Sequence, residues 1–227
     1  MLYVPRKNED RMPELNVAAP QTLDLLLSRR SGSAKRMKGP GPSEAQIRTL
    51  IQAATRVPDH GKLTPWRFLI FKNATRNDFG NLLVRALKQT EPEANAERIA
   101  QEHGRFLRAP VIIGVVSRIR EGTPIPAWEQ TLSAGAACQT LCIAAHAMGF
   151  VANWITEWYA YDPSVCEGLG LRSGERIAGF IYLGHPAEPL EDRPRPAFET
   201  IAQEWTPERR TASVVGGARS RPMSRAT

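Results

Sequence analysis

The stretch VIIGVVS at residues 111–117 and the stretch TLSAGAACQTLCIAAHAM at residues 131–148 decide the fold of this chain. The first is short and nearly continuous in β-branched residues, which indicates a strand buried on both faces. The second is an apolar run of helical length, and its Ala, Gly and Ser residues allow another helix or a ligand to approach closely. A buried strand followed by a long apolar helix indicates a layered domain in which helices cover a sheet.

Strands and helices alternate outward from this pair. Ser43 forms a predicted capping box with Gln46 and opens an amphipathic helix that ends before Pro58. We expect an α+β fold, a three-layer α-β-α sandwich with a mixed sheet. The remaining predicted elements are helices at 22–28, 77–89, within the polar surface segment 91–108, and from 162 to 168 or 170, strands at 67–72, 151–156 and 177–183, and a loop without regular structure at 29–42.

Length and composition are those of a soluble globular protein. The chain has 227 residues, of which 42% are hydrophobic and 23% charged. No apolar run approaches the ~20 residues that span a bilayer, and residues 1–20 contain no apolar stretch typical of a secretory signal. We therefore expect a cytoplasmic protein without a membrane partner, divided into an N-terminal extension (1–20), one domain (21–199) and a basic tail (200–227).

The net charge of +7 raises the possibility of a nucleic-acid partner. Residues 205–227 contain five arginines and one acidic residue, so they carry most of this excess. A tail of Arg, Ser, Gly and Ala without interleaved aromatic residues is more typical of a solvated end than of a binding arm. We expect no nucleic-acid partner, and a basic nucleic-acid or anion-binding module remains the alternative.

The three cysteines are an odd number, which argues against a disulfide framework. Cys138 and Cys142 lie in the apolar helix and are expected to be reduced, buried thiols. Cys142 and His146 share a helix face, but no second pair of ligands appears, so no metal site is predicted.

Three polar segments lie far apart in the chain. They are Arg29-Arg30-Ser31, Pro58-Asp59-His60 with Pro65-Trp66, and Trp128-Glu129-Gln130 leading to Ser133-Ala134-Gly135. In order and spacing they resemble the compact branch of the nitroreductase family of FMN-dependent NAD(P)H nitroreductases. The resemblance covers residues 21–199. One departure is Thr64, since the family usually carries Gln before the proline.

The resemblance implies an obligate homodimer with a mainly antiparallel sheet and two FMN sites at the subunit interface. Hydride would pass from NADH or NADPH through the flavin N5 to a nitro or quinone-like acceptor, a small molecule. No catalytic side chain is predicted, because the flavin carries out the chemistry. A specialised flavin dehydrogenase of the same fold remains an alternative within the family.

The candidate FMN residues are chosen from their side-chain chemistry together with the resemblance. The guanidinium group of arginine binds phosphate through two parallel hydrogen bonds. Two arginines after a helix also interact favourably with the negative end of the helix dipole, which is the simpler interpretation. The resemblance implies that residues 29–31 contact the phosphate and ribityl groups of FMN and that residues 154–156 line the flavin ring. Residues 56–60 would reach the flavin bound mainly by the partner subunit. Residues 193–195 would form either a second phosphate contact or a solvated turn. The FMN candidates are Arg29, Arg30, Ser31, Arg56, His60, Trp154, Ile155, Thr156, Arg193 and Arg195, and the nicotinamide-nucleotide candidates are Ala144, Ala145, His146, Ala147, Met148 and Gly149.

Two further polar features have simpler interpretations. Glu129 is predicted to be an acid at the start of a helix, where it meets the helix dipole. The glycine cluster at residues 39–42 follows no apolar strand and does not match the dinucleotide-binding fingerprint, so it is predicted to be a loop.

Overall fold

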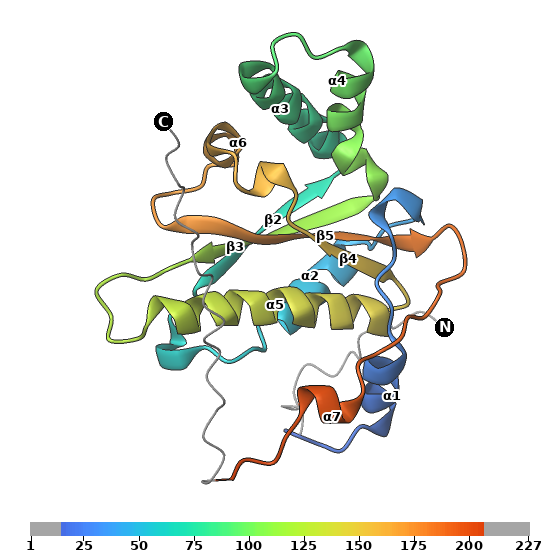
Figure 1. Cartoon of the computed structure of the whole chain (residues 1–227), viewed down its shortest axis with the longest axis vertical. Helices are drawn as coiled ribbons and strands as arrows, with labels where there is room; N and C mark the ends of the chain where they lie inside the picture. Colours follow the sequence, from blue (N-terminus) through green and yellow to red (C-terminus); the bar gives the residue numbers. More distant parts are fainter. Residues whose placement is uncertain (1–14, 207–227) are drawn as a thin grey trace, which may run out of the picture. The chain divides into compact units, whose positions relative to one another are not determined.

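The computed structural model describes residues 15–206, and its first compact unit ends at Glu191. Helices and strands alternate along this unit, as predicted (Figure 1). Its elements are α1 (Pro20–Ser28), β1 (Met37–Lys38), α2 (Glu44–Ala54), β2 (Trp66–Lys72), α3 (Ala74–Thr90), α4 (Ala96–His103), β3 (Val111–Arg118), α5 (Ala127–Ala147), β4 (Val151–Ile155), α6 (Pro163–Gly168) and β5 (Glu175–Pro186).

A five-stranded sheet forms the centre of the unit. The strand order is β1-β5-β3-β2, and β4 also pairs with β5. Every strand pair in the described residues is antiparallel, so the mainly antiparallel sheet is confirmed and the parallel pairing implied by a mixed sheet is absent from residues 15–206. Sequence did not reveal this, because the long helical connection between β2 and β3 has the length to return the chain in either direction.

The two faces of the sheet bury different cores, because successive side chains of a strand point to opposite faces. In β3, Val111, Ile113 and Val115 pack in the core formed with α2 and α5, whereas Ile112 and Val116 pack in the core formed with α3 and α6. Helices therefore cover both faces of the sheet, and the three-layer arrangement is the predicted one (Figure 1).

Helix α5 lies along the sheet and has one fully buried face. Its buried small and apolar side chains recur at helical spacing, at Ala134, Ala137, Cys138, Leu141, Cys142 and Ala145. The helix begins at Ala127, four residues before the predicted start, because Pro126 at the N-cap position ends the preceding loop. Residues 128–130 therefore lie in its first turn.

Two local predictions gave different outcomes. The capping box of α2 is confirmed: Ser43 Oγ accepts from the Gln46 backbone N–H, and Gln46 Oε1 accepts from the Ser43 backbone N–H. The loop at 29–42 is not entirely irregular. It contains a 3-10 turn at Ala34–Arg36 and the strand β1, which pairs with the end of β5.

The second compact unit begins at Asp192. Its described residues form one short helix, α7 (Phe198–Ile201). The predicted division of the chain after residue 199 stays a prediction. Residues 1–14 of the predicted extension and 207–227 of the predicted tail lie outside the described residues. Among residues 15–206, no helix is long and apolar enough to cross a membrane.

Candidate active site

The loop after α1 places its two arginines in different surroundings. Arg29 Nη2 donates to Ser31 Oγ at 3.1 Å, and Arg29 Nε is buried without a hydrogen-bond partner among the described residues. Arg30 Nε instead donates to the Glu191 carbonyl at 2.7 Å. The loop lies close to β4, because a Cβ on Gly32 would come 2.7 Å from Val151 Cγ2. Arg29 and Ser31 thus form one donor group, and Arg30 points elsewhere.

The last turn of α5 packs beside this loop. His146 Nε2 donates to the Arg30 carbonyl at 2.9 Å. Burial lowers the pKa of His146, and the positive charge of Arg29 acts in the same direction. Burial also raises the pKa of the Cys142 thiol to about 12, so this cysteine is a packing residue rather than a nucleophile.

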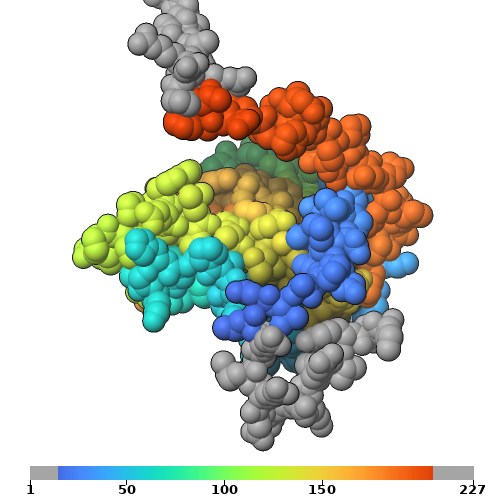
Figure 2. Space-filling view, turned by 90° about the horizontal axis from the view of Figure 1, so that it is seen from below, coloured from blue at the N-terminus to red at the C-terminus, as the bar shows by residue number. Residues whose placement is uncertain are grey.

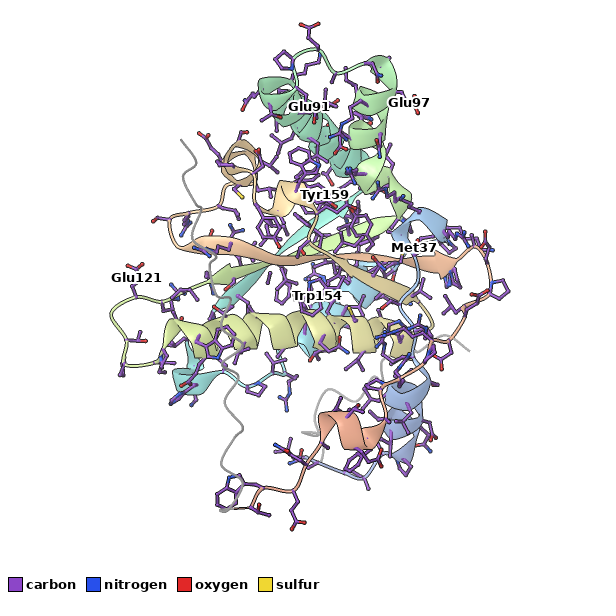
Figure 3. All side chains as sticks on the ribbon, viewed as in Figure 1. Met37, Glu91, Glu97, Glu121, Trp154 and Tyr159 are labelled. Carbon is purple, nitrogen blue, oxygen red and sulfur yellow. The ribbon has the colours of Figure 1, made fainter. Side chains whose placement is uncertain are left out.

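Trp154 of β4 lies between the sheet and α5 (Figure 3). Its indole Nε1 donates to the Ala178 carbonyl at 3.0 Å, and 41% of the residue is exposed. A Cβ on Gly179 would lie 1.9 Å from the same nitrogen, so the indole rests directly on the β5 backbone. Gly135 of α5 faces the far end of the ring. A half-exposed aromatic surface is therefore fixed on the α5 side of the sheet.

The loop at 58–66 has its own internal hydrogen bonds and is hydrogen-bonded to the first half of α5. Asp59 accepts from the backbone N–H groups of Leu63 and Thr64, each at 2.9 Å. Thr64 has φ 50°, an unfavourable value for a β-branched residue, and the hydrogen bond to Asp59 holds it there. Ser133 Oγ donates to the Pro58 carbonyl at 2.7 Å.

His60 projects from this loop to the first turn of α5. Its Nδ1 lies 2.8 Å from Glu129 Oε2, and both side chains are largely exposed. Glu129 is in the first helical turn, as predicted, and it also orients the His60 ring. Because the carboxylate accepts, Nδ1 carries the proton in this contact.

The two groups of candidate residues lie at opposite ends of α5. Glu129 and His146 are separated by 17 residues, which corresponds to about 25 Å along a helix. Figure 2 looks onto this face, with α1 in blue at one end of the yellow helix and the cyan loop that precedes β2 at the other. One chain therefore brings Arg29, Ser31 and His146 together but leaves His60 far from them.

The other candidates differ in exposure. Arg56 and Thr156 are exposed, whereas Ile155 packs against the core of the α3 layer. In the nicotinamide candidate segment 144–149, Ala145 and Met148 are buried. Arg193 and Arg195 belong to the second unit, so their contribution stays a prediction.

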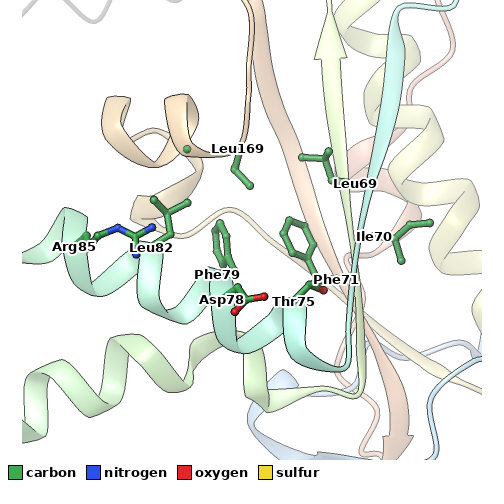
Figure 4. A pocket seen from close by; sticks show the side chains of 10 residues that line it. Leu69, Ile70, Phe71, Thr75, Asp78, Phe79, Leu82, Arg85 and Leu169 are labelled. Carbon is green, nitrogen blue, oxygen red and sulfur yellow. The ribbon is translucent and has the colours of Figure 1, made fainter.

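A cavity of about 440 Å³ lies in the opposite layer, beside the edge strand β2 (Figure 4). Its lining includes Phe71 and Phe79, which belong to the α3 core, with Asp78 and Arg85 on its polar side. None of the predicted site residues lines it, so this cavity is separate from the candidate site.

Sequence reasoning missed two contacts of the site. The bond from His146 to Arg30 joins residues 116 positions apart, and no local pattern predicts such a contact. The His60–Glu129 pair joins two segments that were both singled out, although their contact was not predicted. The divergence of Arg29 and Arg30 also had no sequence signal.

Known proteins are similar to this chain in sequence and in structure. Residues 26–185 match the Nitroreductase family. The chain is 35% identical to "Putative NAD(P)H nitroreductase YdjA" of Escherichia coli (strain K12) over 164 residues, 72% of this chain and 87% of that protein. The fold is similar to a nitroreductase-like protein from Bacillus cereus (TM-score 0.71, 21% identity, 83% of this chain and 98% of that one). It is also similar to a protein from Desulfovibrio desulfuricans described as "a putative nitroreductase in complex with fmn" (TM-score 0.63, 24% identity, 84% of this chain and 100% of that one).

The fold and the match over most of its length define the class of this protein. The chain belongs to the nitroreductase family and is an oxidoreductase. The predicted resemblance is confirmed.

Proposed function

We propose that this chain binds FMN and transfers hydride from NADH or NADPH to a nitro or quinone-like acceptor. The observation that carries the proposal is the donor group at residues 29–31. Arg29 Nε is buried without a partner, and the Ser31 backbone N–H makes no hydrogen bond among the described residues. A buried, unpartnered guanidinium N–H is costly unless an anion satisfies it. These residues therefore fit the phosphate of FMN.

The remaining candidate residues fit the other parts of FMN. Trp154 offers a fixed aromatic surface of the kind that packs against a flavin ring. When bound, FMN would supply the redox chemistry, accepting and returning hydride at its N5. The chain's own residues hold the phosphate at Arg29 and Ser31 and orient the ring at Trp154. None of them is assigned a proton-transfer step.

Of the two rival functions, one fits the same site and the other explains less of it. A flavin dehydrogenase of the same fold would use the same donors and differ only in its acceptor. A nucleic-acid module would rest on the positive charge, much of which lies in residues 207–227, and would leave the buried donor of Arg29 unexplained.

The purified protein tests this function directly. We expect a yellow preparation with flavin absorbance near one FMN per chain and NADH or NADPH oxidation that depends on a nitroaromatic or a quinone. A colourless protein that FMN does not reconstitute would contradict the proposal. Oligonucleotide binding with a steep salt dependence would then favour the basic module.

Arg29→Ala is expected to weaken FMN binding by about tenfold to a hundredfold. A charge-assisted hydrogen bond contributes about 1.5 to 3 kcal/mol, and the substitution removes a loop side chain rather than a core group. Titration of the apoprotein with FMN, alongside its melting temperature, measures both effects. Arg48→Ala, at an exposed position of α2, is the matched control and should leave FMN affinity unchanged. Equal affinities in the two variants would exclude Arg29 from the site.

We also propose that the protein is a homodimer that joins both groups of candidate residues. Helix α1 buries none of its residues, and its Leu23, Leu26 and Leu27 are exposed at helical spacing. Trp128 and Leu132 of α5 are exposed as well. A two-fold axis across the middle of α5 would cover these side chains and bring His60 of one chain near Arg29 of the other.

Sedimentation is expected to show a dimer whose mass does not change on dilution. Leu132→Glu should produce monomers and reduce FMN content, because it places a charge in the proposed interface. Leu107→Glu is the control, since Leu107 is exposed to a similar extent but lies in the opposite layer. A wild-type monomer that retains FMN tightly would contradict the proposal.

A further inference from the structure

We propose that His146 is a positioning residue for the cofactor phosphate. Its ring N–H holds the Arg30 carbonyl and thereby turns the Ser31 backbone N–H toward the phosphate. The inference rests on the proposed function and deepens it, because it assigns a role to a residue of α5 that is not itself a phosphate ligand.

The hydrogen bond between His146 and Arg30 has one possible direction. A carbonyl oxygen only accepts, so the proton of this 2.9 Å contact is on His146 Nε2. His146 lies in the last turn of α5, and the rigid helix fixes the position of the ring. The loop after α1 is thus tied to an element more than a hundred residues away in the chain.

The geometry of the peptide bond sets the direction of the Ser31 backbone N–H. The bond between Arg30 and Ser31 is trans, so its C=O and its N–H point in opposite directions. Because the carbonyl points to His146, the Ser31 N–H points away from the ring. This N–H makes no hydrogen bond among the described residues. An oriented, unpartnered backbone N–H is the donor that anion sites commonly use.

The surroundings of the His146 ring determine its charge. Burial and the neighbouring charge of Arg29 lower the pKa of His146, whereas its hydrogen bond to Arg30 raises it. The ring is therefore neutral at neutral pH, with its proton on Nε2. His146 acts by holding the backbone, and Arg29 supplies the positive charge.

This role differs from the nicotinamide contact predicted for residues 144–149. A ring that is half-buried and bonded to Arg30 has its donor already engaged. Loss of His146 should therefore change the affinity for the cofactor phosphate and leave the KM for NADH or NADPH of the FMN-saturated enzyme unchanged.

The test compares FMN with riboflavin, which lacks the phosphate. Apoprotein is titrated with each flavin in wild type, His146→Leu and His146→Gln. We expect His146→Leu to weaken the binding of FMN about tenfold and the binding of riboflavin less than twofold. His146→Gln should stay within about threefold of wild type for FMN, because its amide N–H can reach the Arg30 carbonyl.

Cys142→Ala is the matched control, because it removes buried volume one turn earlier on the same helix, and the Cys142 thiol takes no part in the hydrogen bonds of residues 29–31. It should affect the two flavins equally. An equal loss of both flavins in His146→Leu would show a general structural role and overturn the inference. Unchanged FMN binding in His146→Leu, or a raised KM for NADH in the FMN-saturated variant, would also overturn it. A wild-type chain that binds neither flavin would overturn the proposed function together with this inference.

Discussion

Replacing Glu102 with alanine is expected to lower the free energy of unfolding by about 2 to 4 kcal/mol, because it removes the buried carboxylate that accepts hydrogen bonds from Arg98, Arg105 and Trp158. Glu102 is fully buried at the end of α4. Arg98 donates to one of its oxygens, Arg105 donates to both, and Trp158 Nε1 donates to Oε2 at 2.7 Å. Burial alone would raise the pKa of Glu102, but the bonds from Arg105 and Trp158 lower it.

The direction of the Glu102 pKa shift determines how its contribution to stability depends on pH. Since the folded pKa is lowered, the contribution of Glu102 is present above its unfolded pKa and is lost as the pH falls through the folded value. Urea unfolding of wild type and variant at neutral pH measures the difference.

Glu97→Ala is the matched control on the same helix. Glu97 is exposed in the first turn of α4, so its loss should cost at most about 1 kcal/mol. Similar decreases in the free energy of unfolding for the two variants would mean that Glu102 is not the centre of a buried charge network.

Local signals predicted much of the fold. The β-branched run at 111–117, the capping box at Ser43 and the apolar face of α5 each have a physical cause within a few residues, and each element formed as predicted. The polar segment 91–108 was predicted to be a surface helix, and this prediction was wrong for Glu102. Composition indicates a polar helix. It does not reveal that Arg98 of α4, Arg105 of the next 3-10 turn and the indole of Trp158, in the turn after β4, all donate to one carboxylate.

The candidate site was predictable only in part, for the same reason. Arginine and serine at 29–31 indicate an anion site by their chemistry. The contacts that orient them come from residues more than a hundred positions away, such as His146. Residue type therefore predicted which groups matter, and only the structure showed that Arg29 and Arg30 diverge.

Gly179→Ala is expected to destabilise the protein by about 2 to 4 kcal/mol. The added methyl group would overlap the Trp154 indole, since the Cβ would lie 1.9 Å from Nε1. Overpacking costs about 1 to 3 kcal/mol, and loss of the hydrogen bond to Ala178 costs about 1 kcal/mol more. A displaced indole should also weaken FMN binding, by at least about tenfold, or ~1.4 kcal/mol.

Gly135→Ala is the matched control, because Gly135 faces the same indole from α5. Its Cβ would lie 3.9 Å from Trp154 Cη2, an ordinary contact. Alanine is also the better residue in a helix interior, by roughly 0.5 to 1 kcal/mol, so this variant should be as stable as wild type or more stable.

A double-mutant cycle separates the overlap from any other effect of the methyl group. Trp154→Ala removes the atoms that the Gly179 methyl group would meet, so Gly179→Ala should cost less than about 1 kcal/mol in that background. If the stability losses of the two single variants add up to that of the double variant within about 0.5 kcal/mol, the two residues act independently. Trp154 would then not be held by the β5 backbone, and the fixed surface proposed for the flavin ring would have to come from another part of the chain.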